Sequence, residues 1–416
     1  MSSQFTEWRK LPISLNELCI ATTLRCGQSF RWQKLPESDE WRCVLRGRLI
    51  SLRQDPSHLY YQSYAPPNSF ATPPRSTPSS QFEAAAISKH DSSLLDETRA
   101  IITHYLNLTS NLTDLYEQWS DSDPNFKKKA PNFTGIRILR QDAWEALVSF
   151  ICSSNNNIAR ISQMVEKLCT NYGDLIATID ERPYHDFPTP EALTGKDVEA
   201  RLRELGFGYR AKYIYQTALM VANERERGWL DSLRNPESPA FGMAPSPGGI
   251  MRPEGREGYR VAHEKLLELQ GVGPKVADCV CLMGLGWGES VPVDTHVWQI
   301  AQRDYKFGRS GNKSLTKATY DAVGNHFRKL WGKEAGWAHS VLFTADLKNF
   351  SDRLASEIDV KVKQEADLPV ETVVTSTVAT KRPLDEDGTE ADTKQELIVQ
   401  AAETKVTRRR TKRQRR

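Results

Sequence analysis

The stretch Leu-Gln-Gly-Val-Gly-Pro-Lys, residues 269–275, decides the fold, and the apolar run Val-Ala-Asp-Cys-Val-Cys-Leu-Met follows it at 276–283. Gly271 and Gly273 allow the backbone to turn tightly between two helices, and the uncovered N–H groups of such a turn can hold a phosphate. Pro274 suits the first turn of a helix, because the N–H that it lacks would have no intrahelical partner there. We therefore predict two helices joined by a tight hairpin.

Lys275 stands at the beginning of the second of these helices. Val276, Val280 and Met283 recur on one of its faces, which predicts a mostly buried helix. A helix N-terminus and apolar surroundings both disfavour an ammonium group, so they lower the pKa of the amine and free its lone pair. These are the properties of a nucleophilic lysine, although a solvated lysine beside an ordinary turn remains an alternative.

Asp294 follows 19 residues after the lysine, within Val-Pro-Val-Asp-Thr-His-Val-Trp at 291–298. Val297, Ile300 and Ala301 come next with helical spacing, so the aspartate is predicted to be a helix N-cap. Taken singly, the hairpin, the lysine and the aspartate each have a plain structural explanation. The three in this order are far less expected by chance, and they indicate a site that combines an amine with a carboxylate.

Length and composition bound the class of protein. A chain of 416 residues allows two or three domains, and its net charge of +3 is too small for bulk attraction to DNA, which would need a local basic face and backbone amides. Its seven cysteines show no CxxC pair or closely spaced framework, which favours reduced thiols over a zinc, disulfide or iron–sulfur scaffold. Without an apolar run of transmembrane length or a secretory signal pattern, we expect a soluble intracellular protein.

The N-terminal part of the chain has the pattern of an antiparallel sheet. Short β-type runs separated by Pro, Gly, Asp and Ser occur at Ser29–Gln33, Trp41–Leu45, Leu49–Leu52 and Leu59–Tyr64. Residues 65–81 are rich in Pro, Ser and Thr and are predicted to be an exposed insertion. We assign residues 1–138 to this domain.

Helical periodicity dominates residues 139–350, which we predict to be an all-helical domain and which makes the fold class α+β. Asp142 stands near the cap of a buried helix, and the three asparagines Asn155–Asn157 favour a turn before a new helix begins at Ile158. Residues 236–258 are rich in Pro and Gly and are interpreted as a lengthened surface loop.

The last 66 residues lack hydrophobic periodicity. Residues 351–416 contain 14 Lys and Arg and 13 Asp and Glu, so we expect a disordered tail. Its final ten residues, 407–416, hold seven basic side chains. Such a cluster is typical of a nuclear-import signal or a loose contact with nucleic acid.

Taken together, these motifs resemble the helix-hairpin-helix DNA glycosylases, and among them the eukaryotic 8-oxoguanine DNA glycosylases, which are also lyases at abasic sites. The resemblance covers most of residues 5–350. Besides the hairpin and Asp294, it is carried by Gly-Gln-Ser-Phe-Arg-Trp at 27–32 and Ser-Ser-Asn-Asn-Asn-Ile-Ala-Arg at 153–160. It implies that the last domain is a helix-hairpin-helix glycosylase domain and that DNA binds across the cleft between this domain and the sheet.

The resemblance implies base excision followed by strand scission. Lys275 would attack C1′ of a flipped-out nucleotide, and Asp294 would stabilise the positive charge that develops on the sugar. The resulting Schiff base would allow β-elimination of the 3′ phosphate, so no metal or redox cofactor is required. A structural cation held by hairpin carbonyls near Leu269 and Val272 is left open. The expected partner is double-stranded DNA containing 8-oxoguanine opposite cytosine, bound by a monomer in the nucleus, with a mitochondrial pool left open.

The resemblance also assigns residues that contact DNA. Asn155 would fill the gap left by the flipped nucleotide, Tyr209 would wedge into the duplex, and Arg160 and Arg210 would read the orphaned cytosine. An ordinary capping turn and a solvated helix start are the structural alternatives for these positions. The full set of expected DNA contacts is Asn155, Arg160, Tyr209, Arg210, Gly271, Gly273, His296 and Lys313.

A second set of implied residues forms the pocket for the damaged base. The carbonyl of Gly27 would accept the N7 proton that 8-oxoguanine has and guanine lacks, and Cys279 and Phe343 would face the two sides of the base, although either can also be plain core. The full set is Gly27, Cys279, Pro292, Asp294, His339 and Phe343.

His339 departs from the family, which usually has glutamine there. A neutral imidazole accepts one hydrogen bond from the base and a protonated one accepts none, so recognition is expected to weaken as pH falls through roughly 6.5. The alternative is that His339 is rotated away from the base and that a water molecule makes the hydrogen bond in its place. For the whole protein, the rival functions are a related glycosylase for another damaged base and a non-catalytic helix-hairpin-helix binding module. Lys275 and the segment at Gly27 argue against the first, and Asp294 argues against the second.

Overall fold

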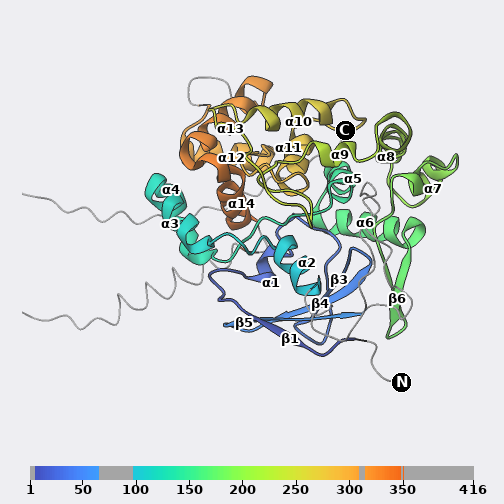
Figure 1. Ribbon diagram of the computed structural model, residues 1–416. Helices are drawn as coiled ribbons and strands as arrows, with labels where there is room; N and C mark the ends of the chain where they lie inside the picture. Colours follow the sequence, from blue (N-terminus) through green and yellow to red (C-terminus); the bar gives the residue numbers. More distant parts are fainter. Residues whose placement is uncertain (1–4, 65–96, 309–313, 348–349, 351–416) are drawn as a thin grey trace, which may run out of the picture. The chain divides into compact units, whose positions relative to one another are not determined.

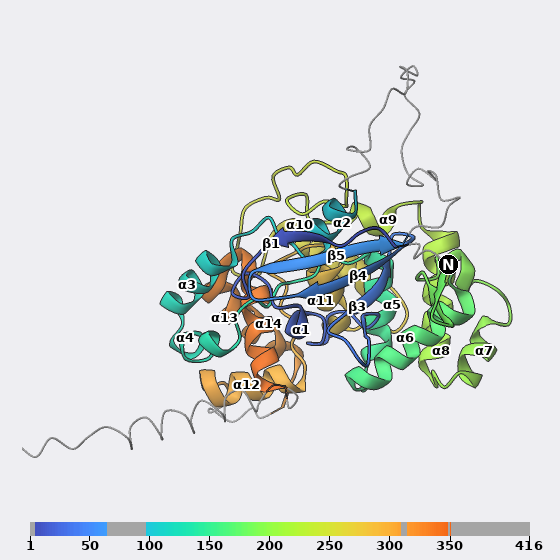
Figure 2. The ribbon, with the colours of Figure 1, turned by 90° about the horizontal axis from the view of Figure 1, so that it is seen from below.

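An antiparallel five-stranded sheet is built from the first part of the chain (Figure 1). This computed structural model describes residues 5–64, 97–308, 314–347 and 350, so the predicted insertion 65–81 and the tail 351–416 lie outside the described residues. The strand order is β1-β5-β4-β3-β2, and the strands lie side by side in Figure 2. Their bounds are β1 Arg9–Pro12, β2 Gln33–Lys34, β3 Trp41–Leu45, β4 Arg48–Gln54 and β5 His58–Tyr64.

Both faces of this sheet are covered, which explains why β3 is buried along its whole length. Ile50 on one face packs with Ile101 and Ile102 of helix α2, Glu97–Tyr105. Leu49, its neighbour in β4, points to the opposite face and packs with Tyr184 of a two-stranded hairpin. The hairpin, β6 Leu175–Ile179 and β7 Arg182–His185, lies inside the part of the chain that was expected to be all helical.

The predicted strand Ser29–Gln33 is wrong except at its end, because only Gln33 and Lys34 pair with β3. Residues 29–32 do not pair with a neighbouring strand, and their side chains contact helices instead. Phe30 meets the ring of Phe150 edge to face at 5.8 Å. The indole Nε1 of Trp32 donates to the Tyr105 hydroxyl at 3.1 Å.

The rest of the described chain is mainly helical, and its helices α10 to α13 gather on the side away from the sheet (Figure 1). This confirms the predicted α+β class. Besides α2, the helices are α1 Ile20–Thr23, α3 Leu112–Ser122, α4 Pro124–Lys129, α5 Ala143–Ser153, α6 Ile158–Tyr172, α7 Val198–Glu204, α8 Arg210–Leu219, α9 Trp229–Ser232, α10 Glu257–Leu267, α11 Pro274–Met283, α12 Thr295–Tyr305, α13 Lys317–Trp331 and α14 Ala335–Asp346. No described helix combines the length and apolarity that a bilayer crossing needs.

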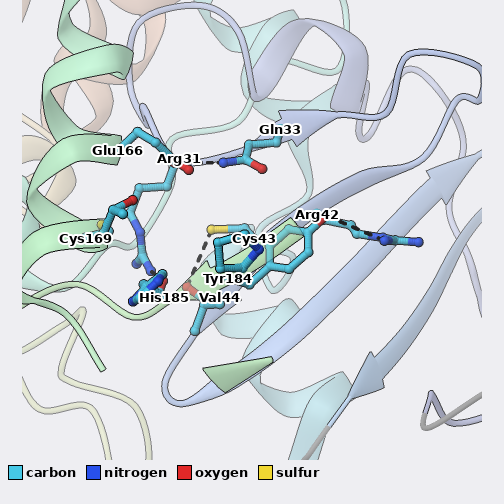
Figure 3. A pocket seen from close by; sticks show the side chains of 11 residues that line it. Arg31, Gln33, Arg42, Cys43, Val44, Glu166, Cys169, Tyr184 and His185 are labelled. Carbon is cyan, nitrogen blue, oxygen red and sulfur yellow. Dashed lines mark hydrogen bonds between the residues drawn. The ribbon is translucent and has the colours of Figure 1, made fainter. Parts of the chain in front are cut away.

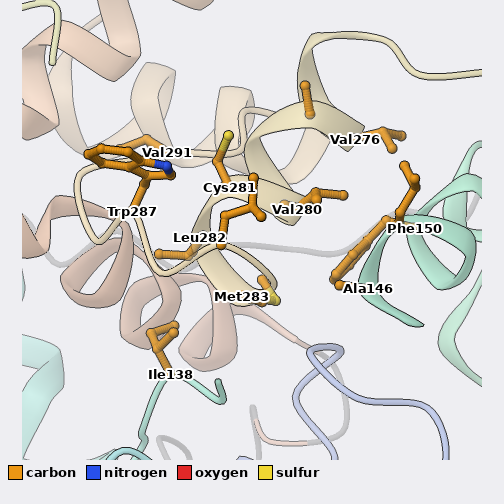
Figure 4. Packing of buried hydrophobic residues seen from close by; sticks show 14 of the residues in the cluster. Ile138, Ala146, Phe150, Val276, Val280, Cys281, Leu282, Met283, Trp287 and Val291 are labelled. Atoms are coloured by element: carbon orange, nitrogen blue, oxygen red, sulfur yellow. The ribbon is translucent and has the colours of Figure 1, made fainter. Parts of the chain in front are cut away.

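Helix α11 is the centre of the main core, as Figure 4 shows. From Val276 to Met283 every residue is buried, and α11 packs against α5 so closely that a Cβ at Gly284 would lie 3.0 Å from Ala146. The predicted cap of α5 is confirmed, since the Asp142 carboxylate accepts from the backbone N–H groups of Trp144 and Glu145 at 2.9 Å. This packing holds the N-terminus of α11 in a fixed place.

Polar side chains of Arg31, just before β2, and Gln33, at its start, join the N-terminal part of the chain to the helices. Arg31 donates to Glu145 of α5 at 2.7 Å, and both side chains are more than nine-tenths buried. Gln33 donates to Glu166 of α6 at 2.7 Å beside it, and both line the small hollow in Figure 3. Removing a charged group from water is costly unless it is paired. The seam between sheet and helices, formed by these contacts of Arg31 and Gln33, is therefore expected to lose stability when either partner is removed.

The predicted surface loop 236–258 is only partly exposed. Ile250 projects into solvent, but Phe241 packs against the cluster beneath the sheet and lies 4.9 Å from the Arg46 guanidinium. At the far end Arg256 is fully buried and makes two bonds to Glu289, at 2.8 and 2.7 Å. Pro and Gly content signalled a loop correctly, but it gave no sign of this docking onto the N-terminal part.

Candidate active site

The hairpin between α10 and α11 forms as predicted, but its two glycines do different things. Gly271 has φ +77°, and a Cβ there would lie 2.7 Å from the ring of Tyr213, so both conformation and space require glycine. Gly273 has an ordinary φ of −99° and caps α11, with nothing within 4 Å of its Cβ position. Pro274 occupies the first helical position, as expected.

Lys275 therefore sits in the first turn of α11 with its amine in a half-buried position. Its Nζ donates to the Ser153 hydroxyl at 3.2 Å and lies 5.2 Å from the ring centroid of Phe150. Both contacts come from α5, the helix against which α11 is packed. An apolar ring and a hydroxyl are weak partners for an ammonium, and among the described residues no carboxylate forms an ion pair with this amine.

Asp294 caps α12, as predicted, by accepting from the backbone N–H of Val297 at 2.9 Å. Its neighbour Val293 donates its backbone N–H to the Tyr320 hydroxyl at 3.3 Å. The same hydroxyl donates to the carboxylate of Asp278. Two helices, α11 and α13, thus fix the backbone immediately before the aspartate.

Asp278 was missed in the sequence, although it is a carboxylate in an otherwise apolar run. It is buried and accepts from Tyr259 at 2.6 Å and from Ser290 at 2.8 Å in addition to Tyr320. A carboxylate can be buried without a large loss of stability when hydrogen-bond donors surround it, as these three hydroxyl groups do. A lone acidic residue on the buried face of a predicted helix was the signal available.

A pocket brings the predicted catalytic and base-binding residues together. It lies where α11, the start of α12 and α14 meet the N-terminal segment, and every residue assigned to the base pocket lines it together with the predicted nucleophile. The predicted members are Gly27, Lys275, Cys279, Pro292, Asp294, His339 and Phe343. Gly27 has φ +84°, and a Cβ there would lie 3.2 Å from Ile158, so glycine is required at this wall.

Among the buried groups that line this pocket, His339 and Cys279 have displaced pKa values. Burial lowers the pKa of His339 to about 4, against an opposing contribution from the Asp294 carboxylate. Burial also raises the pKa of the Cys279 thiol to about 11, so that the sulfur is protonated at neutral pH. The expectation that His339 titrates near 6.5 is therefore wrong, because the unperturbed value ignores the loss of hydration.

A larger hollow of about 670 Å³ lies between α10, α11 and α13. Lys275 and Pro274 line it, and Lys275 also lines the base pocket. Lys275 thus lines both hollows.

The residues expected to face the orphaned cytosine form a second group, at the turn between α5 and α6. Asn155 is exposed with φ +49°, and Asn157 caps α6 by accepting from the backbone N–H of Arg160 at 3.0 Å, as the turn prediction required. Tyr209 is 49% exposed and donates its hydroxyl to Ser154. This group lies outside the base pocket.

Arg210 does not present a free guanidinium. It is 3% exposed and donates to the carbonyls of Ser154 and Asn155, the latter at 3.2 Å, while its guanidinium carbon lies 4.6 Å from the ring centroid of Tyr209. The side chain therefore holds the turn in shape. Contact with a base would require this buried side chain to become accessible.

The remaining predicted contacts are placed only in part. His296 is exposed in the first turn of α12, and its ring meets Phe343 edge-on at 6.3 Å. Lys313 lies outside the described residues. Within the described residues, no group of three or more His, Cys, Asp or Glu side chains is arranged to hold a metal ion.

Comparison with protein families gives two consecutive matches. Residues 10–147 match the model described as 8-oxoguanine DNA glycosylase, N-terminal domain. Residues 148–331 match the HhH-GPD superfamily of base excision DNA repair proteins.

Similar proteins extend these matches over most of the chain. An N-glycosylase/DNA lyase of Saccharomyces cerevisiae is 37% identical over 89% of this chain and 95% of the relative. The N-glycosylase/DNA lyase OGG1 of Arabidopsis thaliana is 33% identical over 82% of this chain and 80% of the relative. Among solved structures, MBOgg1 in complex with a low-affinity DNA ligand has a TM-score of 0.61 and 25% identity, covering 83% of this chain and 98% of the other.

The fold is also shared with a more distant protein. The Clostridium acetobutylicum 8-oxoguanine glycosylase/lyase, in complex with double-stranded DNA containing cytosine opposite 8-oxoguanine, has a TM-score of 0.60 at 22% identity. It covers 83% of this chain and 99% of its own.

Proposed function

Because the chain belongs to the 8-oxoguanine DNA glycosylase family of base excision repair enzymes, and is an N-glycosylase with DNA lyase activity, we propose that it excises 8-oxoguanine paired with cytosine through a Schiff base on Lys275. The observation that carries this is the convergence of Lys275 and Asp294 on one pocket. Family membership excludes the rival of a non-catalytic binding module.

The lysine is suited to covalent chemistry at C1′ of the sugar. The amine nitrogen bonds to C1′ while the N-glycosidic bond breaks, and the base leaves with the bonding electrons and takes up a proton. Opening of the sugar ring and loss of the amine proton give an imine. Removal of a C2′ proton then expels the 3′ phosphate, so no step calls for a metal or a redox cofactor.

Asp294 acts by charge. Positive charge develops on the sugar as the base departs, and a fixed carboxylate facing the pocket stabilises it without reorganising. The backbone before it is tied to Tyr320 and through that residue to Asp278. This pinning keeps the carboxylate in one place during the reaction.

Recognition of the lesion needs a nucleotide outside the helix, at a cost of a few kcal/mol. In the pocket, the Gly27 carbonyl is proposed to accept the N7–H of 8-oxoguanine, which guanine cannot donate. On the opposite strand, Asn155, Tyr209 and the two arginines Arg160 and Arg210 are proposed to fill the gap and read cytosine.

The test is borohydride trapping on a duplex with 8-oxoguanine opposite cytosine. Trapped protein of the expected mass, absent with an undamaged duplex and with Lys275→Gln, supports the proposal. Trapping on 3-methyladenine or other alkylated bases but not on 8-oxoguanine would favour the rival of a related glycosylase for another base.

Localisation and assembly are part of the same proposal. We propose a nuclear location on the basis of the seven basic residues among 407–416, and a monomeric enzyme. A mitochondrial pool remains an alternative destination for some copies.

A further inference from the structure

His339 is the side chain on the inner wall of the base pocket whose hydrogen-bonding atoms are uncommitted. It is 4% exposed, and neither ring nitrogen has a hydrogen-bond partner among the described residues. Its polar neighbours in the pocket bond to the protein instead: Gln28 donates to Arg137, Ser340 to Gly336 and Thr344 to Ser340. An unsatisfied buried group is costly, so this imidazole is suited to a ligand that supplies its partner.

The ring is also held in its position. Its centroid lies 5.9 Å from that of Phe327 and 6.4 Å from that of Phe343, with tilted planes on both sides. Burial keeps it neutral near pH 7, since its pKa is lowered to about 4 even with Asp294 nearby. A neutral imidazole offers one donor and one in-plane acceptor lone pair.

One lone pair can satisfy one donor of a purine. The pairing edge of 8-oxoguanine presents O6, N1–H and the 2-amino group in a row. The two ring carbons beside Nε2 carry hydrogens, which can face O6 but give an amino group nothing to bond. The central N1–H is therefore the donor that a single acceptor fits.

Resting on the proposed function, we propose that His339 reads only the N1–H of the damaged base, so that the substrate class is 8-oxopurines bearing N1–H, with or without the 2-amino group. The predicted second substrate is 8-oxohypoxanthine, which keeps O6, N1–H, N7–H and the 8-oxo group and also pairs with cytosine. The chemistry at C1′ is unchanged, because the base leaves from the same nitrogen.

The experiment measures single-turnover excision, with enzyme in excess, from duplexes carrying 8-oxoguanine, 8-oxohypoxanthine or hypoxanthine opposite cytosine. The wild-type enzyme is expected to excise the two 8-oxo bases at rates within about threefold, because one hydrogen bond is common to both. Hypoxanthine, which lacks N7–H, should be excised far more slowly.

His339→Gln supplies the matched comparison, since an amide oxygen has two lone pairs and can accept from N1–H and the amino group together. It should prefer 8-oxoguanine over 8-oxohypoxanthine by about tenfold, the value of one added hydrogen bond. His104→Gln is the control, because His104 is another histidine with its pKa lowered by burial and its Nε2 bonds to the Pro239 carbonyl, outside the pocket. Its ratio should match the wild type.

A wild-type preference for 8-oxoguanine of tenfold or more overturns the inference and leaves the proposed function standing. Failure of the wild type on both 8-oxo bases overturns the proposed function itself. If His339→Gln does not fold, the wild-type ratio still decides.

Discussion

Lys275 stands in the first turn of the buried helix α11 and Asp294 is the N-cap of α12, whereas Asn155 lies on a turn and Tyr209 at a half-exposed helix start. The pocket proposed for the lesion is already formed in this structure, and Lys275, the proposed nucleophile, contacts α5. On the side proposed to face cytosine, Arg210 is buried and bonded to the turn between α5 and α6, so it would have to become accessible to contact a base. We therefore expect the chemistry to be preorganised and the reading of the opposite base to require rearrangement on binding.

The largest effect is expected from removing Lys275, the proposed nucleophile. Lys275→Gln is expected to abolish excision and borohydride trapping while duplex affinity stays within a few-fold, because the change removes the amine and little surface. Gel-shift and trapping assays on the same duplex check this. Robust trapping by the variant would show that another amine does the chemistry.

Replacing the carboxylate by its amide probes the same region more gently. Asp294→Asn should fold with its cap intact, because asparagine caps helices as well as aspartate, and should lose about 10²–10³-fold in single-turnover rate. The melting temperature shows whether the N-cap of α12 is kept, and the single-turnover rate shows what the loss of the negative charge costs. A rate within a few-fold of wild type would move the electrostatic role to another group.

On the cytosine side a smaller and more selective effect is expected. Arg210→Lys keeps a cation but loses the planar fork, so the preference for cytosine over adenine opposite the lesion should fall by about tenfold. Excision opposite cytosine should change less. Equal rate losses opposite both bases would mean that Arg210 only shapes the turn.

A pH series tests the base pocket through His339. Since the pKa of His339 is lowered to about 4, its ring is neutral from pH 5.5 to 8, and the ratio of wild-type to His339→Gln excision rates should be flat over that range. The same depression means that burial of this histidine costs stability as pH falls from about 6.5 toward 4, where the unfolded chain is protonated and the folded one is not. A ratio that falls between pH 7 and 5.5 would show that the site titrates near the unperturbed value.

The smallest effect on excision is expected at the end of the chain. Deleting residues 405–416 should leave the single-turnover rate unchanged and shift a fluorescent fusion out of the nucleus. Loss of excision at physiological salt would identify the tail as a DNA-binding arm instead.

Local signals predicted the local structure of the site well. The caps at Asp142, Asn157 and Asp294 follow from short polar side chains before apolar periodic runs, and the structure has all three. The pocket itself was inferred from resemblance, because its members are spread from Gly27 to Phe343 and no spacing rule connects them. The geometry now brings them together, while their roles remain predictions.

What the sequence could not supply depends on contacts far apart in the chain. The segment before Gln33 has β-type residues, but Phe30 and Arg31 are engaged by α5 and so do not join the ladder. The pKa of His339 is set by burial among residues from distant elements, which no local pattern reveals. The docking of Phe241 against the sheet side has the same origin.

The seam between sheet and helices has an evolutionary consequence. The two family matches meet between residues 147 and 148, inside helix α5, and Arg31 from the first match forms ion pairs both with Glu145 of that helix and with Asp186 from the second match. Helix α11, which carries Lys275, packs on α5 as well. Neither matched segment carries all of α5, so we expect exchange of one segment alone to disturb the packing that supports Lys275.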